Sequence, residues 1–162
     1  MAAYLILLAI VVLSGLWLFA WPRWRRKWLL AKPFPPAWHA IIQRRMPFYG
    51  KLQRAEQQQL RDLIRLFVAD KKYFGCDGLQ ITDEIRVTIA AEACLLLLNR
   101  DTEVYAGLRY ILVYPYAFQV PHQALNADGT VRAYSEGRLG ESWENGKVIL
   151  SWDDVEKGVS NR

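Results

Sequence analysis

The sequence has few of the residue types that build metal sites or nucleophilic sites. Its 162 residues include two histidines and two cysteines. His39 and His122 lie far apart, and neither has a second ligand at helical or hairpin spacing, so the chain contains no local zinc motif. Cys76 and Cys94 are also widely spaced, which argues against a disulfide framework and indicates thiols in a reducing compartment.

The familiar catalytic motifs are missing as well. The chain has no HExxH, no GxSxG, no GxxxxGKS and no GxGxxG followed by a helix. The stretch from Gly75 to Gly78 is glycine-rich, but it lacks the lysine and the hydroxyl that bind phosphate, so we expect a tight loop. The sequence indicates no general base that would activate Cys76, in this stretch, as a nucleophile. We therefore expect no complete catalytic site in this chain.

The charged residues do not indicate a site either. The formal net charge is +5, and much of the excess comes from the short stretch between Arg23 and Lys32. Other basic residues are scattered without the aromatic interleaving of a nucleic-acid platform, so we expect no nucleic-acid partner. Five carboxylates could in principle supply an acid and a base, but they lie near expected turns and strand ends, where solvated charge is the ordinary explanation. They are Glu136, Glu141, Glu144, Asp153 and Asp154.

The N-terminal segment predicts a transmembrane helix over residues 1–22. No charged residue occurs from Ala2 to Trp21, and about twenty apolar residues suffice to cross a bilayer. Basic residues and tryptophans follow at once in a basic, proline-rich juxtamembrane linker over 23–36. They predict a single-pass protein of the inner (cytoplasmic) membrane, in contact with lipid, with its N-terminus out and its C-terminal domain cytoplasmic. A cleaved signal, whose charges would precede the apolar run, and a buried core helix are the alternatives.

Two amphipathic or apolar segments predict helices in the rest of the chain. Apolar residues at three- and four-residue spacing predict one helix from Arg54 to Asp70. Thr82 is a good N-cap for a second helix that continues to Leu98 and is apolar on nearly all sides, so we expect it to be central and buried. Arg86 and Glu92 would be covered there and would need partners.

The pattern changes to alternation farther along the chain. Residues Arg109–Tyr114 are rich in β-branched and aromatic side chains and predict a strand. Asn126–Gly129 has turn composition, and Glu144–Gly146 predicts a hairpin leading into a strand over Val148–Trp152. Helices followed by an antiparallel sheet define the α+β class, and we expect a single domain over 37–162.

A set of segments carries a family resemblance over about residues 33–158. They are Pro33–Pro36 with Trp38, then Pro47 and Tyr49, Gly78–Thr82, Ile85–Leu98, Ile111–Pro115 with Phe118, Gly140–Trp143, and Gly146–Trp152 with Val155 and Gly158. In content, order and spacing these segments resemble the N-terminal part of the MtfA-like zinc metallopeptidase family, which includes the DgsA (Mlc) anti-repressor.

The resemblance implies an incomplete zincin-like domain. In that family the zinc-binding HExxH helix follows soon after the segment similar to Leu150–Trp152, and a further glutamate ligand comes later. This chain ends at Arg162, before either. The implied protein is a membrane-anchored, cytosol-facing zinc-dependent peptidase truncated before its zinc site and inactive as this chain. Zinc is the cofactor of the full-length family, none is expected to bind here, and we assign no catalytic, cofactor-binding or metal-ligating residue.

The alternative is a non-catalytic regulatory module that binds a cytosolic protein or peptide partner, such as a transcriptional repressor. Whether the chain is an enzyme therefore stays open. A domain cut before its central helix would leave apolar sheet surface uncovered, and such patches favour aggregation or a partner. We expect residues 33–162 alone to be poorly soluble.

Overall fold

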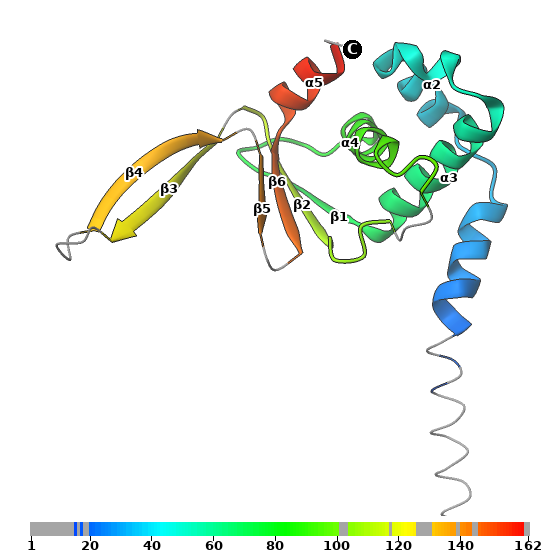
Figure 1. Ribbon diagram of the computed structural model, residues 1–162, viewed down its shortest axis with the longest axis horizontal. Helices are drawn as coiled ribbons and strands as arrows, with labels where there is room; N and C mark the ends of the chain where they lie inside the picture. The colour runs from blue at the N-terminus through cyan, green and yellow to red at the C-terminus, as the bar shows by residue number, and fades with distance from the viewer. Residues whose placement is uncertain are drawn as a thin grey trace, which may run out of the picture. The chain divides into compact units, whose positions relative to one another are not determined.

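The computed structural model describes residues 15, 17, 20–100, 104–116, 118–125, 131–138, 140–143 and 146–160 (Figure 1). Contacts divide the chain into two units, Met1–Phe34 and Pro35–Arg162. The turn predicted at Asn126–Gly129 lies outside the described residues. So do Glu144 and Asn145 of the second predicted turn.

The N-terminal unit is helical over residues 20–31. The Trp21 ring stacks on Trp17 with centroids 5.1 Å apart and lies tilted against Trp24 at 5.6 Å. The Lys32 ammonium lies 3.5 Å from the Trp28 ring centre. The basic part of the expected 23–36 linker is therefore mostly helix.

The transmembrane prediction needs correction. No helix in the part of the chain that the structure describes is long and apolar enough to cross a membrane. Residues 20–31 carry four basic side chains, which are costly in hydrocarbon, and most of residues 1–19 lie outside the described part. The prediction of a single-pass inner-membrane protein with a cytoplasmic domain therefore does not stand.

Helices open the second unit. Its first elements are α2 (Pro36–Arg45), the short 3-10 helix η1 (Pro47–Lys51) and α3 (Arg54–Asp70). The prediction of α3 is confirmed at both ends: its apolar face buries Leu60, Ile64 and Phe67. A capping box between Gln53 and Glu56 fixes its first turn, since each side chain bonds the other residue's backbone amide.

Helix α4 (Asp83–Leu95) is the central helix, as predicted. The Thr82 hydroxyl accepts a 3.3 Å hydrogen bond from the Ile85 amide, and the helix contacts both α2 and α3. It ends at Leu95 rather than Leu98, because a chain of turns leads to Asn99 at a positive φ of 60°. Arg86 was expected to be covered, but its side chain is 42% exposed and lies 3.6 Å from Asp83.

The remaining elements are strands and one final helix. They are β1 (Lys72–Gly75), β2 (Tyr110–Tyr114), β3 (Phe118–Leu125), β4 (Val131–Arg138), β5 (Gly140–Trp143), β6 (Lys147–Ser151) and α5 (Trp152–Ser160). Strands β3 and β4 form an antiparallel pair of their own, and the other four form one sheet in the order β1-β2-β6-β5.

The predicted antiparallel sheet is wrong for three of those four strands. β1 pairs parallel with β2, and β2 pairs parallel with β6, while only β5 runs antiparallel to β6. The physical reason is α4, which carries the chain from the end of β1 back to the start of β2 and so makes the two strands parallel. The fold is therefore not the helices-then-antiparallel-sheet arrangement expected from the sequence.

One face of this sheet meets the helices. Ile111 and Val113 of β2 are fully buried, while their neighbours Tyr110 and Leu112 are half-buried on the other face. The Tyr73 hydroxyl on β1 donates a 3.4 Å hydrogen bond to the Arg86 carbonyl oxygen of α4, which links the sheet to the central helix.

Candidate functional site

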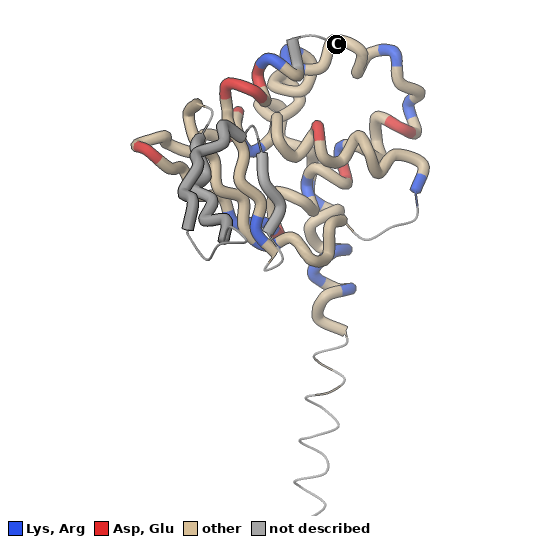
Figure 2. The backbone as a smooth tube through the Cα atoms, turned by 60° about the vertical axis from the view of Figure 1, so that its left-hand side comes forward, with Lys and Arg blue, Asp and Glu red and all other residues tan. Residues whose placement is uncertain are grey.

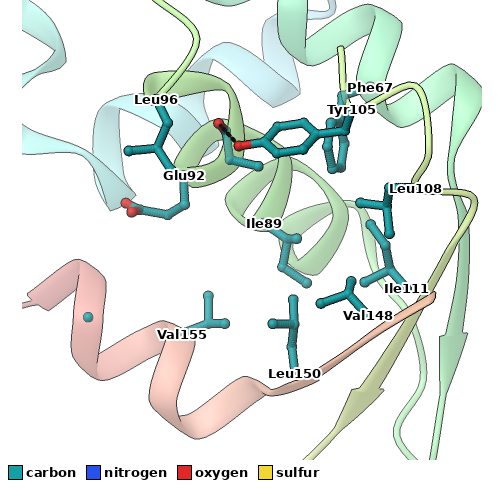
Figure 3. A pocket seen from close by; sticks show the side chains of 12 residues that line it. Phe67, Ile89, Glu92, Leu96, Tyr105, Leu108, Ile111, Val148, Leu150 and Val155 are labelled. Atoms are coloured by element: carbon teal, nitrogen blue, oxygen red, sulfur yellow. Dashed lines mark hydrogen bonds between the residues drawn. The ribbon is translucent and has the colours of Figure 1, made fainter. Parts of the chain in front are cut away.

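An apolar groove lies between α4, α5 and the inner face of the sheet (Figure 3). We call it the α4–α5 groove, and its cavity volume is about 390 Å³. Six segments of the chain line it. They contribute Phe67 of α3; Ile89, Glu92 and Ala93 of α4 with Leu96 directly after it; Tyr105 and Leu108 of the following loop; Ile111 of β2; Val148 and Leu150 of β6; and Val155 and Gly158 of α5.

The floor of the groove is packed and its rim is open. Phe67, Ile89 and Ile111 are 1%, 5% and 0% exposed, so they belong to the core and only their groove-facing surface is accessible. Leu96, in contrast, is 66% exposed at the end of α4. A large exposed leucine next to a buried apolar floor is typical of a surface that another apolar group covers.

Two polar side chains interrupt this apolar lining. The Tyr105 hydroxyl donates a 2.9 Å hydrogen bond to the Ala93 carbonyl oxygen, and burial raises the pKa of this phenol. The carboxylate of Glu92 projects from α4 toward α5 (Figure 3). Such a lining suits recognition of an apolar partner with one or two fixed polar contacts.

The loop that carries Tyr105 is held in a strained conformation. Tyr105 has a positive φ of 47°, which is uncommon for a residue with a side chain. Besides its own hydroxyl bond, its carbonyl oxygen accepts a 2.8 Å hydrogen bond from the Lys71 ammonium. Burial lowers the pKa of Lys71, whose ammonium also lies 5.7 Å from the Phe67 ring centre. The groove wall is therefore fixed before any partner binds.

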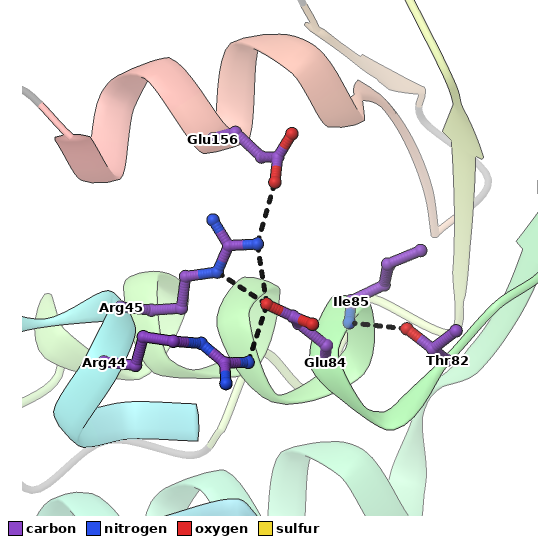
Figure 4. A network of polar contacts seen from close by, with 6 residues as sticks. All are labelled: Arg44, Arg45, Thr82, Glu84, Ile85 and Glu156. Atoms are coloured by element: carbon purple, nitrogen blue, oxygen red, sulfur yellow. Dashed lines mark hydrogen bonds and ion pairs between the residues drawn. The ribbon is translucent and has the colours of Figure 1, made fainter. Parts of the chain in front are cut away.

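A cluster of charged side chains joins α5 to α2 and α4 (Figure 4). Arg45 donates to Glu84 through Nε at 2.8 Å and to Glu156 of α5 at 2.8 Å, and Arg44 donates to Glu84 at 2.9 Å. The Arg45 guanidinium also lies 5.6 Å from the Trp152 ring centre.

The pKa shifts in this cluster follow from these bonds. The hydrogen bond from Arg45, opposed by burial and supported by Arg44, lowers the pKa of Glu84. Burial by itself would lower the pKa of Arg45, but its bonds to Glu84 and Glu156 outweigh it and raise the value. The cluster is a structural link that sets the position of α5.

Among the side chains that the structure describes, the candidate residues from the sequence do not come together in a catalytic arrangement. His39 packs edge-on against Tyr49 with ring centroids 5.8 Å apart, and the side chain of His122 lies outside the described part. Both cysteines are free thiols, as predicted. Cys76 is half-buried and hydrogen-bonds Tyr114, whose pKa that bond raises. Cys94 is buried, which raises its pKa to about 12.

The carboxylates and basic residues also have ordinary structural roles where they are described. Asp153 pairs with Lys157 at 2.5 Å, and the Asp154 amide donates to the Ser151 hydroxyl at 3.3 Å at the start of α5. The side chains of Glu136 and Glu141 lie outside the described part. Figure 2 shows the Lys and Arg positions of the second unit distributed over several helices and loops.

Zinc, which the family resemblance implies, does not fit these residues. Among the described side chains there is no group of three His, Cys, Asp or Glu placed to hold a metal ion. A catalytic zinc site takes three such ligands.

The second unit therefore contains a mixed four-stranded sheet with helices against one face and an apolar groove beside α5. Residues 21–162 match the family described as glucose-regulated metallo-peptidase M90. The chain belongs to this family, which confirms the resemblance to MtfA-like proteins.

Three curated relatives show the extent of the match. Uncharacterized protein slr2042 of Synechocystis is 43% identical over 137 residues, which are 83% of this chain and 50% of that protein. Mlc titration factor A of Klebsiella pneumoniae is 30% identical over 68% of this chain and 42% of its own length. The protein of the same name from Yersinia pestis is 26% identical over 80% and 49%. The chain thus spans about half the length of the curated relatives it matches.

The sequence predicted uncovered apolar surface but not this groove. Its lining comes from segments between Phe67 and Gly158 that no local pattern joins. The one available signal was the leucine run through Leu98, which continues past the end of α4 and leaves Leu96 exposed.

Proposed function

We propose that this chain forms the N-terminal, non-catalytic part of a zinc-dependent metallopeptidase domain and does not hydrolyse peptides by itself. The observation that carries the proposal is the match of residues 21–162 to a metallo-peptidase family in a chain that spans about half of its relatives. The absence of HExxH from the 162 residues supports the same proposal, since that motif supplies two zinc ligands and a general base.

In this proposal the described residues support a site rather than form it. The sheet, α4 and α5 provide a packed frame with one open apolar side, and the Arg45 cluster fixes α5 on that frame. The metal ligands and the general base would come from the part of the domain that has no counterpart in these 162 residues.

The test is zinc content and peptide cleavage by the purified full chain. We expect substoichiometric zinc by elemental analysis and no chelator-sensitive cleavage of a casein or peptide library, with thermolysin as the positive control for the assay. One zinc per chain together with chelator-sensitive cleavage that co-purifies with the chain would contradict the proposal.

The alternative is a regulatory module that acts through a protein partner without hydrolysis. The family match is to a metallo-peptidase and does not favour it. A protein or peptide partner, and the absence of a nucleic-acid partner, stay predictions.

A further inference from the structure

We infer that the α4–α5 groove binds an amphipathic helix from the part of the peptidase domain that this chain does not span. This inference rests on the proposed function, because it assigns the groove to the part of the same domain that the chain does not match in its relatives. Three observations carry it: the stripe of side chains on α4, the small residues on both walls, and the length of the relatives.

The stripe on α4 has the spacing of a helix-packing surface. Ile89, Ala93 and Leu96 are separated by four and three residues and line the groove together. Side chains at i, i+4 and i+7 lie on one face of a helix and typically meet a second element packed along it. Because the rim residue Leu96 is 66% exposed, this face has no complete cover within the described residues.

The groove wall formed by α5 has room for a close approach. Val155 and Gly158 are three residues apart, so both lie on the side of α5 that faces the groove. A Cβ added at Gly158 would meet no atom within 4 Å. With Ala93 on the opposite wall, the groove has a small residue on each side, which lets a helix backbone come near both.

A helix is the form of chain that such a groove accepts. Both polar side chains of the lining, Glu92 and Tyr105, have partners within the chain, and the other lining residues are apolar, so the groove offers few hydrogen bonds to an occupant. An inserted strand or loop would leave backbone N–H and C=O groups unpaired, whereas a helix satisfies its own. The occupant should therefore present an apolar stripe to the floor of the groove.

The lengths of the relatives indicate which part of the domain would supply this helix. They contain about as much chain again as the part that this chain matches, because the match covers 50%, 42% and 49% of their lengths. The unmatched half of these relatives is long enough to contain a helix that could cover the open face. The proposed occupant is thus a helix of that half, not a second copy of this chain and not a small apolar ligand.

The experiment is co-expression of the full chain with the half of Synechocystis slr2042 that has no match in it, each with its own tag. We expect the two to co-purify as a one-to-one complex and hydrogen exchange in α5 to slow on binding. Gly158→Leu fills the groove from inside, and Leu96→Asp places a charge on its rim, so each should weaken the complex by about tenfold or more, as expected for a central contact.

Two features keep the result interpretable. Gly158→Leu should fold, because the site is open and leucine favours a helix over glycine by up to about 1 kcal/mol. Tyr116→Asp, at another exposed apolar residue with 73% exposure and outside the groove, is the matched control for Leu96→Asp and should change binding by less than about twofold. Circular dichroism of each variant confirms the fold.

The contrary outcomes separate the two proposals. Absence of a complex with the unaltered chain, a complex that both groove variants retain, or a homodimer of this chain that these variants abolish would each overturn the groove assignment. Zinc content and cleavage are measured separately on the same complexes. A complex that both groove variants weaken, but that shows neither zinc nor cleavage, would support the groove assignment and contradict the peptidase proposal. An active complex that neither variant weakens would contradict the groove assignment alone.

Discussion

Replacing Arg45 with methionine removes the cation that joins α2 to both α4 and α5. Its guanidinium donates to Glu84 and to Glu156, each at 2.8 Å, and methionine keeps much of the side-chain length without the charge. The three side chains are 23%, 34% and 39% exposed, so solvent screens the pairs in part.

The expected loss lies between two known limits. An exposed pair contributes about 0.2–1 kcal/mol, and breaking a fully buried pair costs about 3–5 kcal/mol. With two pairs at about one-third exposure, we expect Arg45→Met to lower the free energy of unfolding by about 1–2 kcal/mol. Urea unfolding of the full chain, followed by tryptophan fluorescence and circular dichroism, measures this difference.

Arg44 provides the matched control. It contacts the same Glu84 oxygen at 2.9 Å but is 60% exposed and has no bond to α5 among the described contacts. Arg44→Met should therefore cost less than about 0.5 kcal/mol. A double-mutant cycle of Arg45→Met with Glu156→Gln isolates the α2–α5 pair from the α2–α4 pair.

The lowered pKa of Glu84 predicts how the loss of stability in Arg45→Met changes with pH. The pKa of Glu84 is lower in the folded chain than in the unfolded chain, where a glutamate has a pKa of about 4.3. The stabilisation by Glu84 is therefore fully present above about pH 4.3 and is lost as the pH falls through the lowered folded value. Equal losses for Arg44→Met and Arg45→Met at pH 7, or an Arg45→Met loss unchanged at pH 3, would refute this reasoning.

Three further predictions test the frame around the groove. Thr82→Ala should lower the free energy of unfolding by about 1 kcal/mol, because it removes the N-cap hydrogen bond of α4, and Thr82→Ser should retain most of it. Gly146→Ala should cost about 2–4 kcal/mol in the same unfolding assay, since φ is 69° and the new Cβ would lie 2.3 Å from the Gly107 carbonyl oxygen. In thiol titration at pH 8, Cys94 should react only after denaturation because it is buried with a raised pKa, and half-buried Cys76 should react first; fast modification of both in the folded chain would contradict this.

The helices could be predicted because their signals are local. The apolar spacing from Leu60 to Phe67 and the cap at Thr82 act within a few residues, so α3 and the start of α4 appear where the sequence places them. Strand β2 and the antiparallel β5–β6 pair also follow from alternation and a short turn. Each of these features depends on residues adjacent in the chain.

The direction of the sheet and the groove could not be predicted because they depend on distant residues. The four residues from Lys72 to Gly75 are too few for a clear alternating pattern, so β1 went unrecognised and its crossover through α4 with it. Alternation reports that a segment is a strand, but not which way its neighbour runs. The groove needs Phe67, Val148 and Gly158 to meet, and only the tertiary fold brings them together.

The open side of α4 nevertheless has a cause in the sequence. The helix is apolar nearly all round, and a helix of that kind is stable in water only when every side is covered. Among the described residues, α2 and α3 contact it, and Tyr73 of the sheet bonds its backbone. The remaining side carries Ile89, Ala93 and Leu96 and faces the groove. The groove therefore follows from the apolar surface of α4 itself, because the described elements cover the other sides of this helix and leave this one open. The part that covers the groove should stabilise α4 when it binds.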